Sequence, residues 1–159
     1  MSRTYTDEIT EDDDGEKFTV KGWAHEIRDL GGITFIILRD RKGTMQLIFK
    51  EDEDKEMFKK AQRVGREDVI SATGVIEEND SAPGDREMHP EKFEIVTEAD
   101  SPLPLEISGN IDSDLSTRLD NRFMDLRQPE KHAIFSLRGK MIESMEEWFA
   151  DNDYIKINT

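Results

Sequence analysis

The sequence ITFIILRDRKGTMQLIFK, residues 33–50, establishes the kind of fold. Two apolar runs, 33–39 and 44–50, flank a polar turn that ends in glycine, which predicts a β-hairpin. Along the second run the inward positions are all apolar, whereas most outward positions are polar. The inward set is Met45, Leu47 and Phe49, and the outward set is Thr44, Gln46, Ile48 and Lys50. This period of two predicts a half-buried sheet and not a helix.

Strand patterns continue on both sides of the hairpin. From residue 17 the chain alternates again, which predicts a first strand with Phe18, Val20, Gly22 and Ala24 on one face. Residues 53–64 fit a short amphipathic helix, and residues 69–76 and 93–97 fit two more strands around a loop at 77–90. Five short strands with a helix between the third and the fourth follow the order of an OB-fold, a Greek-key barrel that binds oligonucleotides. The expected fold is therefore mainly β, although an SH3-like barrel shares much of this spacing.

The expected organisation has four parts. They are an acidic lead-in over 1–16, the barrel over 17–100, a linker or hinge over 101–130, and a long helix with a following strand over 131–159. The linker is expected because residues 101–115 contain two prolines and show no periodicity. Tyr154 to Ile157 is expected to open the last strand.

The long helix carries apolar residues at three- and four-residue steps, and nothing else in the sequence is evidently available to cover them. These residues are Ile134, Leu137, Met141, Met145 and Trp148, with Ile142 and Phe149 beside them. They could belong to an ordinary core. The width of the stripe favours an interface, or contact with a core formed elsewhere.

The composition excludes several classes of protein. The 159 residues have 22 basic and 37 acidic side chains, a formal net charge of −15 at pH 7. No apolar run approaches the roughly 20 residues that a membrane-spanning helix needs, and the acidic N-terminus does not resemble a signal peptide. Because the chain has no cysteine, disulfides, thiolate zinc sites, iron–sulfur clusters and cysteine nucleophiles are excluded. We expect a cytoplasmic protein with no membrane partner, and adaptation to high salt is an open explanation of its acidity.

The charge is unevenly distributed. Residues 1–16 carry a net −6 and residues 17–50 a net +4, so a candidate anion-binding face lies within an acidic protein. Arg28, Phe35 and Gln46 are expected on the outer face of adjacent strands, and a ring beside polar groups is what single-stranded RNA readout requires. The alternative is that Phe35 belongs to the core and that Arg28 and Gln46 are merely solvated.

No catalytic or metal site is expected. The acidic run at 12–14 lacks the ligand spacing of a calcium loop, and the three histidines are scattered. The sequence contains neither a glycine-rich phosphate loop nor a Ser/His/Asp arrangement. By itself, His25 is best interpreted as an ordinary surface histidine.

Four blocks resemble archaeal-type aspartyl-tRNA synthetases of class II. They are GWAHEIRDLGG (22–32), FIILRDRKGTMQLIF (35–49), SPLPLEISG (101–109) and LSTRLDNRFMDLRQPE (115–130). The last block is the most specific to the aspartyl/asparaginyl branch. The resemblance extends over essentially the whole chain and implies an N-terminal anticodon-binding OB-fold.

The resemblance implies a role for individual residues. Phe35 would stack on the central anticodon base, while Arg28, Gln46 and Glu87 would read base edges. Helix 131–150 and the following strand would be the first class II signature motif, which forms the dimer interface, so Ile134, Leu137, Met141, Met145 and Trp148 would face a second subunit. Relatives that also charge the asparagine tRNA tend to have histidine and proline where this chain has His25 and Pro83, which implies relaxed tRNA specificity.

The second and third class II motifs, which hold ATP and aspartate, do not occur in the sequence. The complete enzyme would use ATP and Mg²⁺ and form a homodimer, whereas this chain would need no cofactor and would be inactive alone. Its partner would be the aspartate tRNA and also the asparagine tRNA, and no DNA partner is expected. A truncated or split reading frame and an isolated anticodon-binding paralogue both stay open. The competing functions are a stand-alone nucleic-acid-binding OB module and a helix-mediated protein-interaction module.

Overall fold

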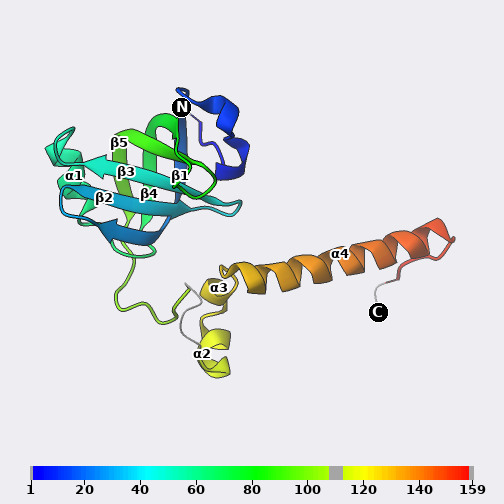
Figure 1. Ribbon diagram of the computed structural model, residues 1–159. Helices are drawn as coiled ribbons and strands as arrows, with labels where there is room; N and C mark the ends of the chain where they lie inside the picture. Colours follow the sequence, from blue (N-terminus) through cyan, green and yellow to red (C-terminus); the bar gives the residue numbers. More distant parts are fainter. Residues whose placement is uncertain (1, 108–112, 158–159) are drawn as a thin grey trace. The chain divides into compact units, whose positions relative to one another are not determined.

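The computed structural model describes residues 2–107 and 113–157, and residues 17–97 form the predicted five-stranded barrel (Figure 1). The strands close in the order β1-β2-β3-β5-β4, with β3 and β5 parallel and all other neighbours antiparallel. The OB-fold prediction is thereby confirmed. The elements are β1 (Lys17–Asp29), β2 (Ile33–Arg39), β3 (Thr44–Lys50), α1 (Lys55–Ala61), β4 (Val69–Glu78) and β5 (Arg86–Thr97).

The inside of the barrel is filled by the apolar residues that the alternation assigned to it. Val20, Ile36, Leu38 and Leu47 are fully buried in one continuous core cluster. Helix α1 packs Phe58 and Ala61 into the same cluster. Its first turn is capped by Asp54, whose carboxylate accepts hydrogen bonds from the N–H groups of residues 56 and 57. The barrel and α1 therefore share one hydrophobic core.

Strand β5 is longer than predicted, because it begins at Arg86 and leaves only residues 79–85 of the expected loop. Proline offers no N–H to a sheet, so Pro90 is an unexpected residue inside this strand. The structure accommodates Pro90 opposite Gly74, where a bulge shifts the register between β4 and β5. A Cβ on Gly74 would collide with the backbone of His89, so only glycine allows the two strands to approach here.

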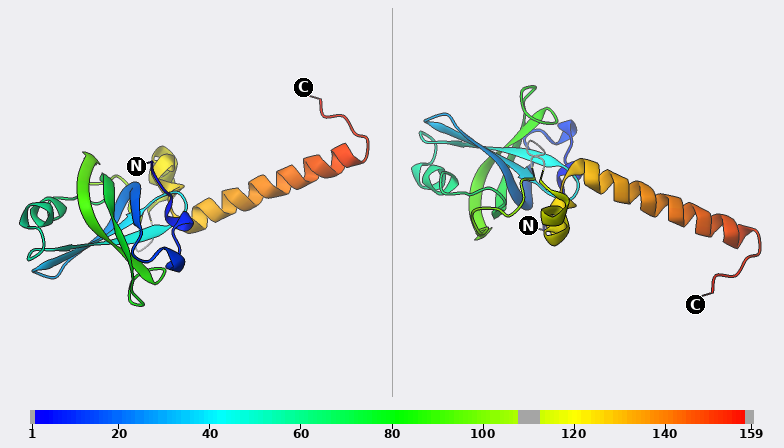
Figure 2. Two further views of the ribbon diagram at one scale, coloured as in Figure 1. Left: turned by 90° about the horizontal axis from the view of Figure 1, so that it is seen from above. Right: turned by 90° about the horizontal axis from the view of Figure 1, so that it is seen from below.

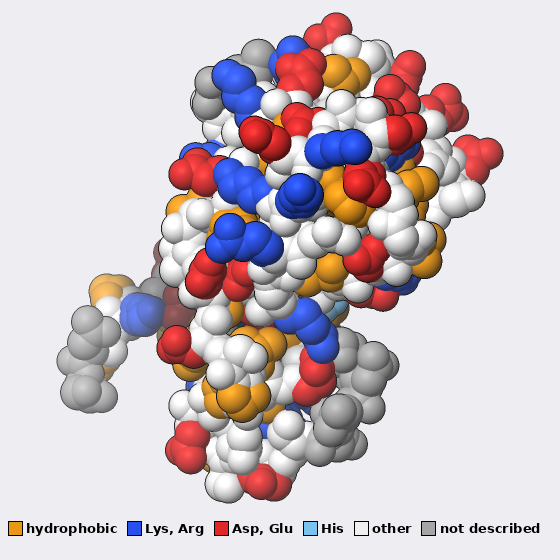
Figure 3. Space-filling view, turned by 90° about the vertical axis from the view of Figure 1, so that its left-hand side faces the viewer, with side chains coloured by type: hydrophobic (Ala, Val, Ile, Leu, Met, Phe, Trp, Pro, Cys, Tyr) orange, Lys and Arg blue, Asp and Glu red, His pale blue; other side chains and the backbone are white. Residues whose placement is uncertain are grey.

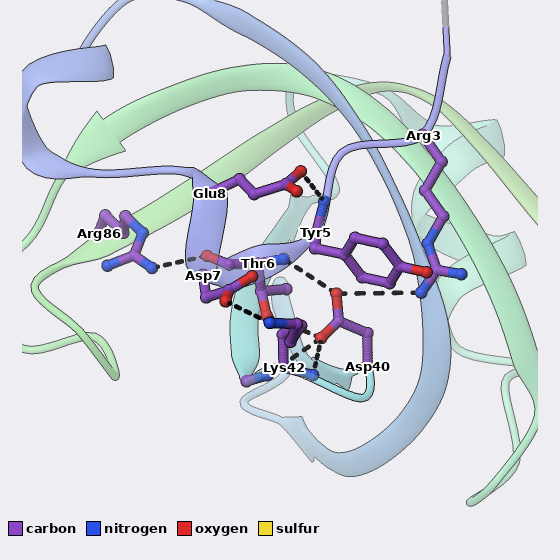
Figure 4. A network of polar contacts seen from close by, with 9 residues as sticks. Arg3, Tyr5, Thr6, Asp7, Glu8, Asp40, Lys42 and Arg86 are labelled. Carbon is purple, nitrogen blue, oxygen red and sulfur yellow. Dashed lines mark hydrogen bonds and ion pairs between the residues drawn. The ribbon is translucent and has the colours of Figure 1, made fainter. Parts of the chain in front are cut away.

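The acidic lead-in contacts the barrel, because its two short 3-10 turns, η1 (Thr6–Glu8) and η2 (Glu11–Asp13), flank a residue of the barrel core. Ile9 is buried in that core. Asp40 in the β2–β3 turn accepts hydrogen bonds from the backbone N–H of Thr6 at 2.9 Å and from its hydroxyl at 3.0 Å (Figure 4). Two backbone N–H groups of the turn itself, those of Lys42 and Gly43, also donate to Asp40. One buried carboxylate therefore fastens both the hairpin turn and the N-terminal segment.

Pro102–Thr159 is the second compact unit of the chain. It contains α2 (Leu115–Asp120), α3 (Arg122–Asp125) and α4 (Pro129–Asp151). Leu105, Ile107 and Met124 form a small core, and Arg118 donates two hydrogen bonds to the Asp125 carboxylate at 3.0 and 3.3 Å. Helix α4 is one unbroken helix in both views of Figure 2, and it buries none of its residues.

The predicted strand at 154–157 is wrong, because these residues have no regular secondary structure. A strand needs a neighbour for its backbone hydrogen bonds, and no strand of the described chain pairs with this segment. Its last two expected residues, 158 and 159, lie outside the described part. Among the described helices, none has the length and apolar character to cross a membrane.

Candidate nucleic-acid interface

The outer face of β1, β2 and β3 carries Phe35 in the middle of a cross-strand row. Phe35 pairs with Arg28 on one side and with Ile48 on the other. Its ring is half-buried and does not belong to the barrel core cluster, so the alternative interpretation of Phe35 as core is wrong. Arg28 is exposed beside it. An aromatic ring and a guanidinium group are therefore neighbours on an accessible surface.

The next row along the same face contains Gln46 and Glu87. The parallel pairing of β3 and β5 puts these residues, which are 41 positions apart, directly side by side. The Gln46 Nε2 atom donates a hydrogen bond to Glu87 Oε2 at 2.9 Å. Both residues are only 7% exposed, so the interpretation of Gln46 as a solvated side chain is also wrong. The contact holds an amide and a carboxylate in one fixed arrangement.

His89 lies next to this pair and was missed by the sequence interpretation. Its Nε2 atom is 3.4 Å from Glu87 Oε1 and 3.2 Å from a carboxylate oxygen of Glu77 on β4. The other Glu87 oxygen accepts from Gln46, so this carboxylate is approached from two sides. No sequence signal pointed to His89, because it lay in a stretch that was expected to be a loop.

The charges at the rim of this face are set by short ion pairs. Arg28 Nε donates to Glu26 Oε1 at 2.8 Å, and this hydrogen bond lowers the pKa of Glu26 and raises the pKa of Arg28. A hydrogen bond from Lys50 to Glu53 at 2.7 Å likewise raises the pKa of Lys50. Figure 3 shows several Lys and Arg side chains, interspersed with Asp and Glu, across the barrel on the side where α1 lies.

His25 lies in a β-bulge of β1, where the register with β2 shifts between Ala24 and Glu26. The extra residue keeps Ala24 and Ile27 both directed toward the core, which a regular alternation would not allow. The His25 side chain is 26% exposed, and its Nδ1 atom is 3.0 Å from an Nη atom of Arg39. Pro83 is exposed in the turn between β4 and β5. The two specificity candidates therefore belong to different elements of the barrel.

Arg39 and Glu67 form a buried ion pair behind His25. Arg39 Nη2 lies 3.0 Å from each Glu67 carboxylate oxygen. The sequence interpretation counted Arg39 only within the basic stretch, and it gave Glu67 no role. Glu67 has a φ of +64°, a left-handed conformation that is uncommon for a residue other than glycine. This backbone conformation marks Glu67 as an unusual position, but it is visible in the structure and not in the sequence.

The apolar stripe of α4 has no cover among the described residues. Ile134, Leu137, Met141, Met145 and Trp148 are all more than half exposed. Four of them, together with Phe149, line a shallow and mainly apolar groove. The rings of Trp148 and Phe149 meet edge to face at 5.3 Å. This exposed surface has the apolar character of a protein–protein contact.

The described residues provide no metal centre. They contain no group of three or more His, Cys, Asp or Glu side chains that could hold an ion.

Comparison with known families gives two matches. An OB-fold nucleic acid binding domain matches residues 18–96, and the family "tRNA synthetases class II (D, K and N)" matches residues 114–159. The chain is 43% identical to the aspartate–tRNA(Asp/Asn) ligase of Archaeoglobus fulgidus and 46% identical to that of Natronomonas pharaonis, covering 99% of this chain in each case. It covers 37% and 36% of those proteins, so it spans little more than a third of the length of the curated relatives it matches.

A solved structure is similar to this chain along most of its length. Asparaginyl-tRNA synthetase from Pyrococcus horikoshii, complexed with asparaginyl-adenylate, superposes with a TM-score of 0.87 at 26% identity. The match covers 99% of this chain and 36% of that structure.

Proposed function

Because the chain belongs to the aspartate–tRNA ligase family, as its N-terminal OB-fold part with the start of the class II domain, we propose that its barrel binds the anticodon of the aspartate tRNA. The single observation that carries the proposal is the outer face of β1, β2, β3 and β5. There the cross-strand register joins Arg28 to Phe35 and Gln46 to Glu87 on adjacent rows.

Each side chain has a chemical part in this proposal. The half-exposed Phe35 ring stacks on the central, unpaired base, an interaction worth roughly 1–3 kcal/mol. Arg28 donates hydrogen bonds to base acceptors, and the Glu87 carboxylate accepts them from base N–H groups. Gln46 offers both kinds of group, and its bond to Glu87 reduces the side-chain freedom that binding would otherwise remove.

The test is binding of the 159-residue chain to an anticodon stem-loop, measured by fluorescence anisotropy. We expect Phe35→Ala to weaken binding about 5- to 150-fold, the equivalent of losing one stacked base. Gln46→Ala removes the partner of a buried carboxylate and is expected to cost about 3- to 10-fold. Phe123→Ala is the matched control, because it removes an equally large ring that is exposed in the second unit.

The comparison with an unrelated anticodon decides whether the face reads sequence. Losses confined to the aspartate stem-loop support readout by this face. Equal losses on both stem-loops would contradict anticodon readout, and full affinity after both substitutions would exclude this face altogether. The stand-alone binding module predicts the equal losses.

We propose further that His25 and Pro83 make the specificity relaxed, so that the chain binds the asparagine anticodon as well. The support is that its relatives are named as ligases of tRNA(Asp/Asn) and that His25 lies half-buried on the barrel surface. Stem-loops with the two anticodons are expected to bind within a few-fold of each other. Strong preference for the aspartate stem-loop would contradict this part of the proposal.

The exposed stripe of α4 is proposed as the contact between two copies of the chain. Its support is the resemblance to the first class II motif together with the absence of cover among the described residues. Sedimentation velocity tests it, and we expect Met141→Asp to dissociate a dimer by placing a charge in the apolar groove. Ser136→Asp adds the same charge at another exposed helix position and should leave the dimer intact. A wild-type chain that remains monomeric at high concentration would contradict the proposal.

Attachment of aspartate to tRNA is proposed only for the complete protein, where the class II family uses ATP and Mg²⁺. The cytoplasm, where tRNAs are charged, is the compartment that this function implies. A chain that dimerises through α4 but binds no tRNA at any salt concentration would favour the protein-interaction module instead.

A further inference from the structure

The contact between Arg39 and His25 determines the chemical form of the histidine ring. Arg39 Nη1 lies 3.0 Å from His25 Nδ1. A guanidinium group has only N–H donors and no acceptor, so His25 Nδ1 has to accept this hydrogen bond through a lone pair. The neutral ring then carries its proton on Nε2. A doubly protonated ring would direct one N–H group at another.

Glu67 holds Arg39 in the orientation that this contact needs. Both Glu67 oxygens accept from Arg39 Nη2, which leaves Nη1 for His25. Glu67 itself is held by the backbone, because its N–H donates to the carbonyl of Ala24 at 2.8 Å. The N–H of Ala24 donates in turn to the carbonyl of Asp68, also at 2.8 Å. Both backbone groups of Ala24, the residue before His25, are thus hydrogen-bonded to the segment that carries Glu67.

The Nε2 atom is the part of the ring that remains available. Within the residues that the structure describes, His25 makes one side-chain hydrogen bond, through Nδ1, and its Nε2 is not among the buried unsatisfied atoms. With 26% of the side chain exposed, the ring can present an Nε2–H donor to a bound base.

A donor at this position would account for tolerance of two anticodons. The aspartate and asparagine anticodons differ only in their third base, which is cytosine in one and uracil in the other. Position 4 of the pyrimidine is a donor in cytosine and an acceptor in uracil, whereas O2 is an acceptor in both. A side chain that only donates can therefore satisfy either base at O2.

We propose that Arg39, held by Glu67, fixes His25 as the Nε2–H tautomer, and that this donor binds the pyrimidine O2 atom of the third anticodon base. Arg39 and Glu67 are positioning residues, since they act through His25. The contact with the pyrimidine O2 atom rests on the proposed function, whereas the tautomer of His25 is a property of the free protein.

The ring state is measured without RNA, by long-range ¹⁵N–¹H correlation spectra of the 159-residue chain near neutral pH. We expect His25 to carry its proton on Nε2 in the wild type and to become a mixture of tautomers in Arg39→Met. Arg41→Met removes a neighbouring arginine that contacts Tyr5, and it should leave the His25 signals unchanged. If Arg39→Met fails to fold, Glu67→Gln keeps the size of the side chain and should shift the tautomer ratio in the same direction. A wild-type ring protonated on Nδ1, or a ratio that neither variant changes, would overturn the inference.

The base atom is identified with anticodon stem-loops modified at the third base. Pyrimidin-2-one, which lacks the group at position 4, should bind within about twofold of cytosine and uracil. 2-Thiouracil, whose sulfur is a poor acceptor, should bind about 3- to 10-fold more weakly than uracil. His25→Phe should abolish this difference, because it keeps a ring and removes the donor.

The two experiments separate the two hypotheses. Equal binding of uracil and 2-thiouracil, with a loss for pyrimidin-2-one, would show that position 4 is read and would overturn the O2 assignment. Failure of every stem-loop to bind would overturn the proposed function and the O2 assignment together. The ring spectra would still decide whether Arg39 sets the tautomer.

Discussion

The barrel and helix α4 use the same kinds of apolar residue in opposite ways. In the barrel Leu47 is fully buried, whereas Leu137 in α4 is 64% exposed. The strands cover one another because the sheet closes on itself, but a single helix has no second layer to pack on. The barrel therefore buries its own apolar residues, whereas α4 leaves an apolar surface exposed on which a partner could pack.

The two regions also differ in how they hold polar groups. On the barrel, Gln46 with Glu87, and Arg39 with Glu67, are buried and paired before any ligand arrives. On α4 the ion pair of Lys140 with Glu143 is exposed, where such pairs contribute little. Preformed polar pairs are typical of a recognition surface, and an apolar stripe with a charged back is typical of an interface helix.

The largest expected effect is the contrast between two leucine truncations. Leu47→Ala should lower the free energy of unfolding by about 2–5 kcal/mol, because it removes buried carbons and leaves a cavity. Leu137→Ala should change it by less than about 0.5 kcal/mol in the monomer. Urea denaturation at a dilution that prevents association measures both. A comparable loss for Leu137→Ala would mean that α4 is packed within the monomer.

Two glycine substitutions should act in opposite directions. Gly74→Ala would bring a Cβ to within 2.7 Å of Pro90 Cα and into the backbone of His89, and it should destabilise the barrel by about 1–3 kcal/mol. Gly139→Ala meets open space on α4 and should stabilise that helix by about 0.5–1 kcal/mol. Thermal unfolding followed by circular dichroism reports both changes. Stabilisation by Gly74→Ala would refute the close approach of β4 and β5.

The smallest effect concerns the exposed cap of α2. Asp114 accepts a hydrogen bond from the Thr117 N–H at 2.8 Å, and this contact lowers the pKa of its carboxyl below the ordinary 3.8. Because the folded-state pKa is the lower one, the capping contribution is present above pH 3.8 and is lost as the pH falls through the folded value. The amide shift of Thr117 in an NMR titration follows this loss. Asp114→Asn should remove the titration and keep a cap, and an unchanged titration would assign it to another group.

Several parts of the fold were predictable because they depend on local pattern. The hairpin at 33–50 and the helix ahead of β4 follow from alternation, turn residues and an amphipathic face. The start of β5 was not predictable, since proline at position 90 argues against a strand unless Gly74 lies opposite, and that pairing joins residues far apart in the chain. The prediction of a strand at 154–157 was wrong because its composition is strand-like but the described chain offers no strand to pair with it.

Some residues of the candidate site were likewise predictable from the sequence, and others were not. Phe35 and Gln46 could be assigned to an outer face from the period of two alone. Glu87 came only from family resemblance, because a parallel contact between β3 and β5 brings it to Gln46. The Arg39–Glu67 pair and the contact with His89 left no signal in the sequence, since each joins segments whose proximity depends on barrel closure.

By itself, the sequence determined which residues face inward along each strand, the order of the elements and the uncovered stripe of the long helix. These features are properties of neighbouring residues, and a periodic pattern of side chains is enough to specify them. Only the tertiary structure decided which polar groups meet, and hence that Arg39 constrains His25 and that Gln46 constrains Glu87. Closing the barrel sets those distances, and no local pattern encodes a distance between strands that are remote in the chain.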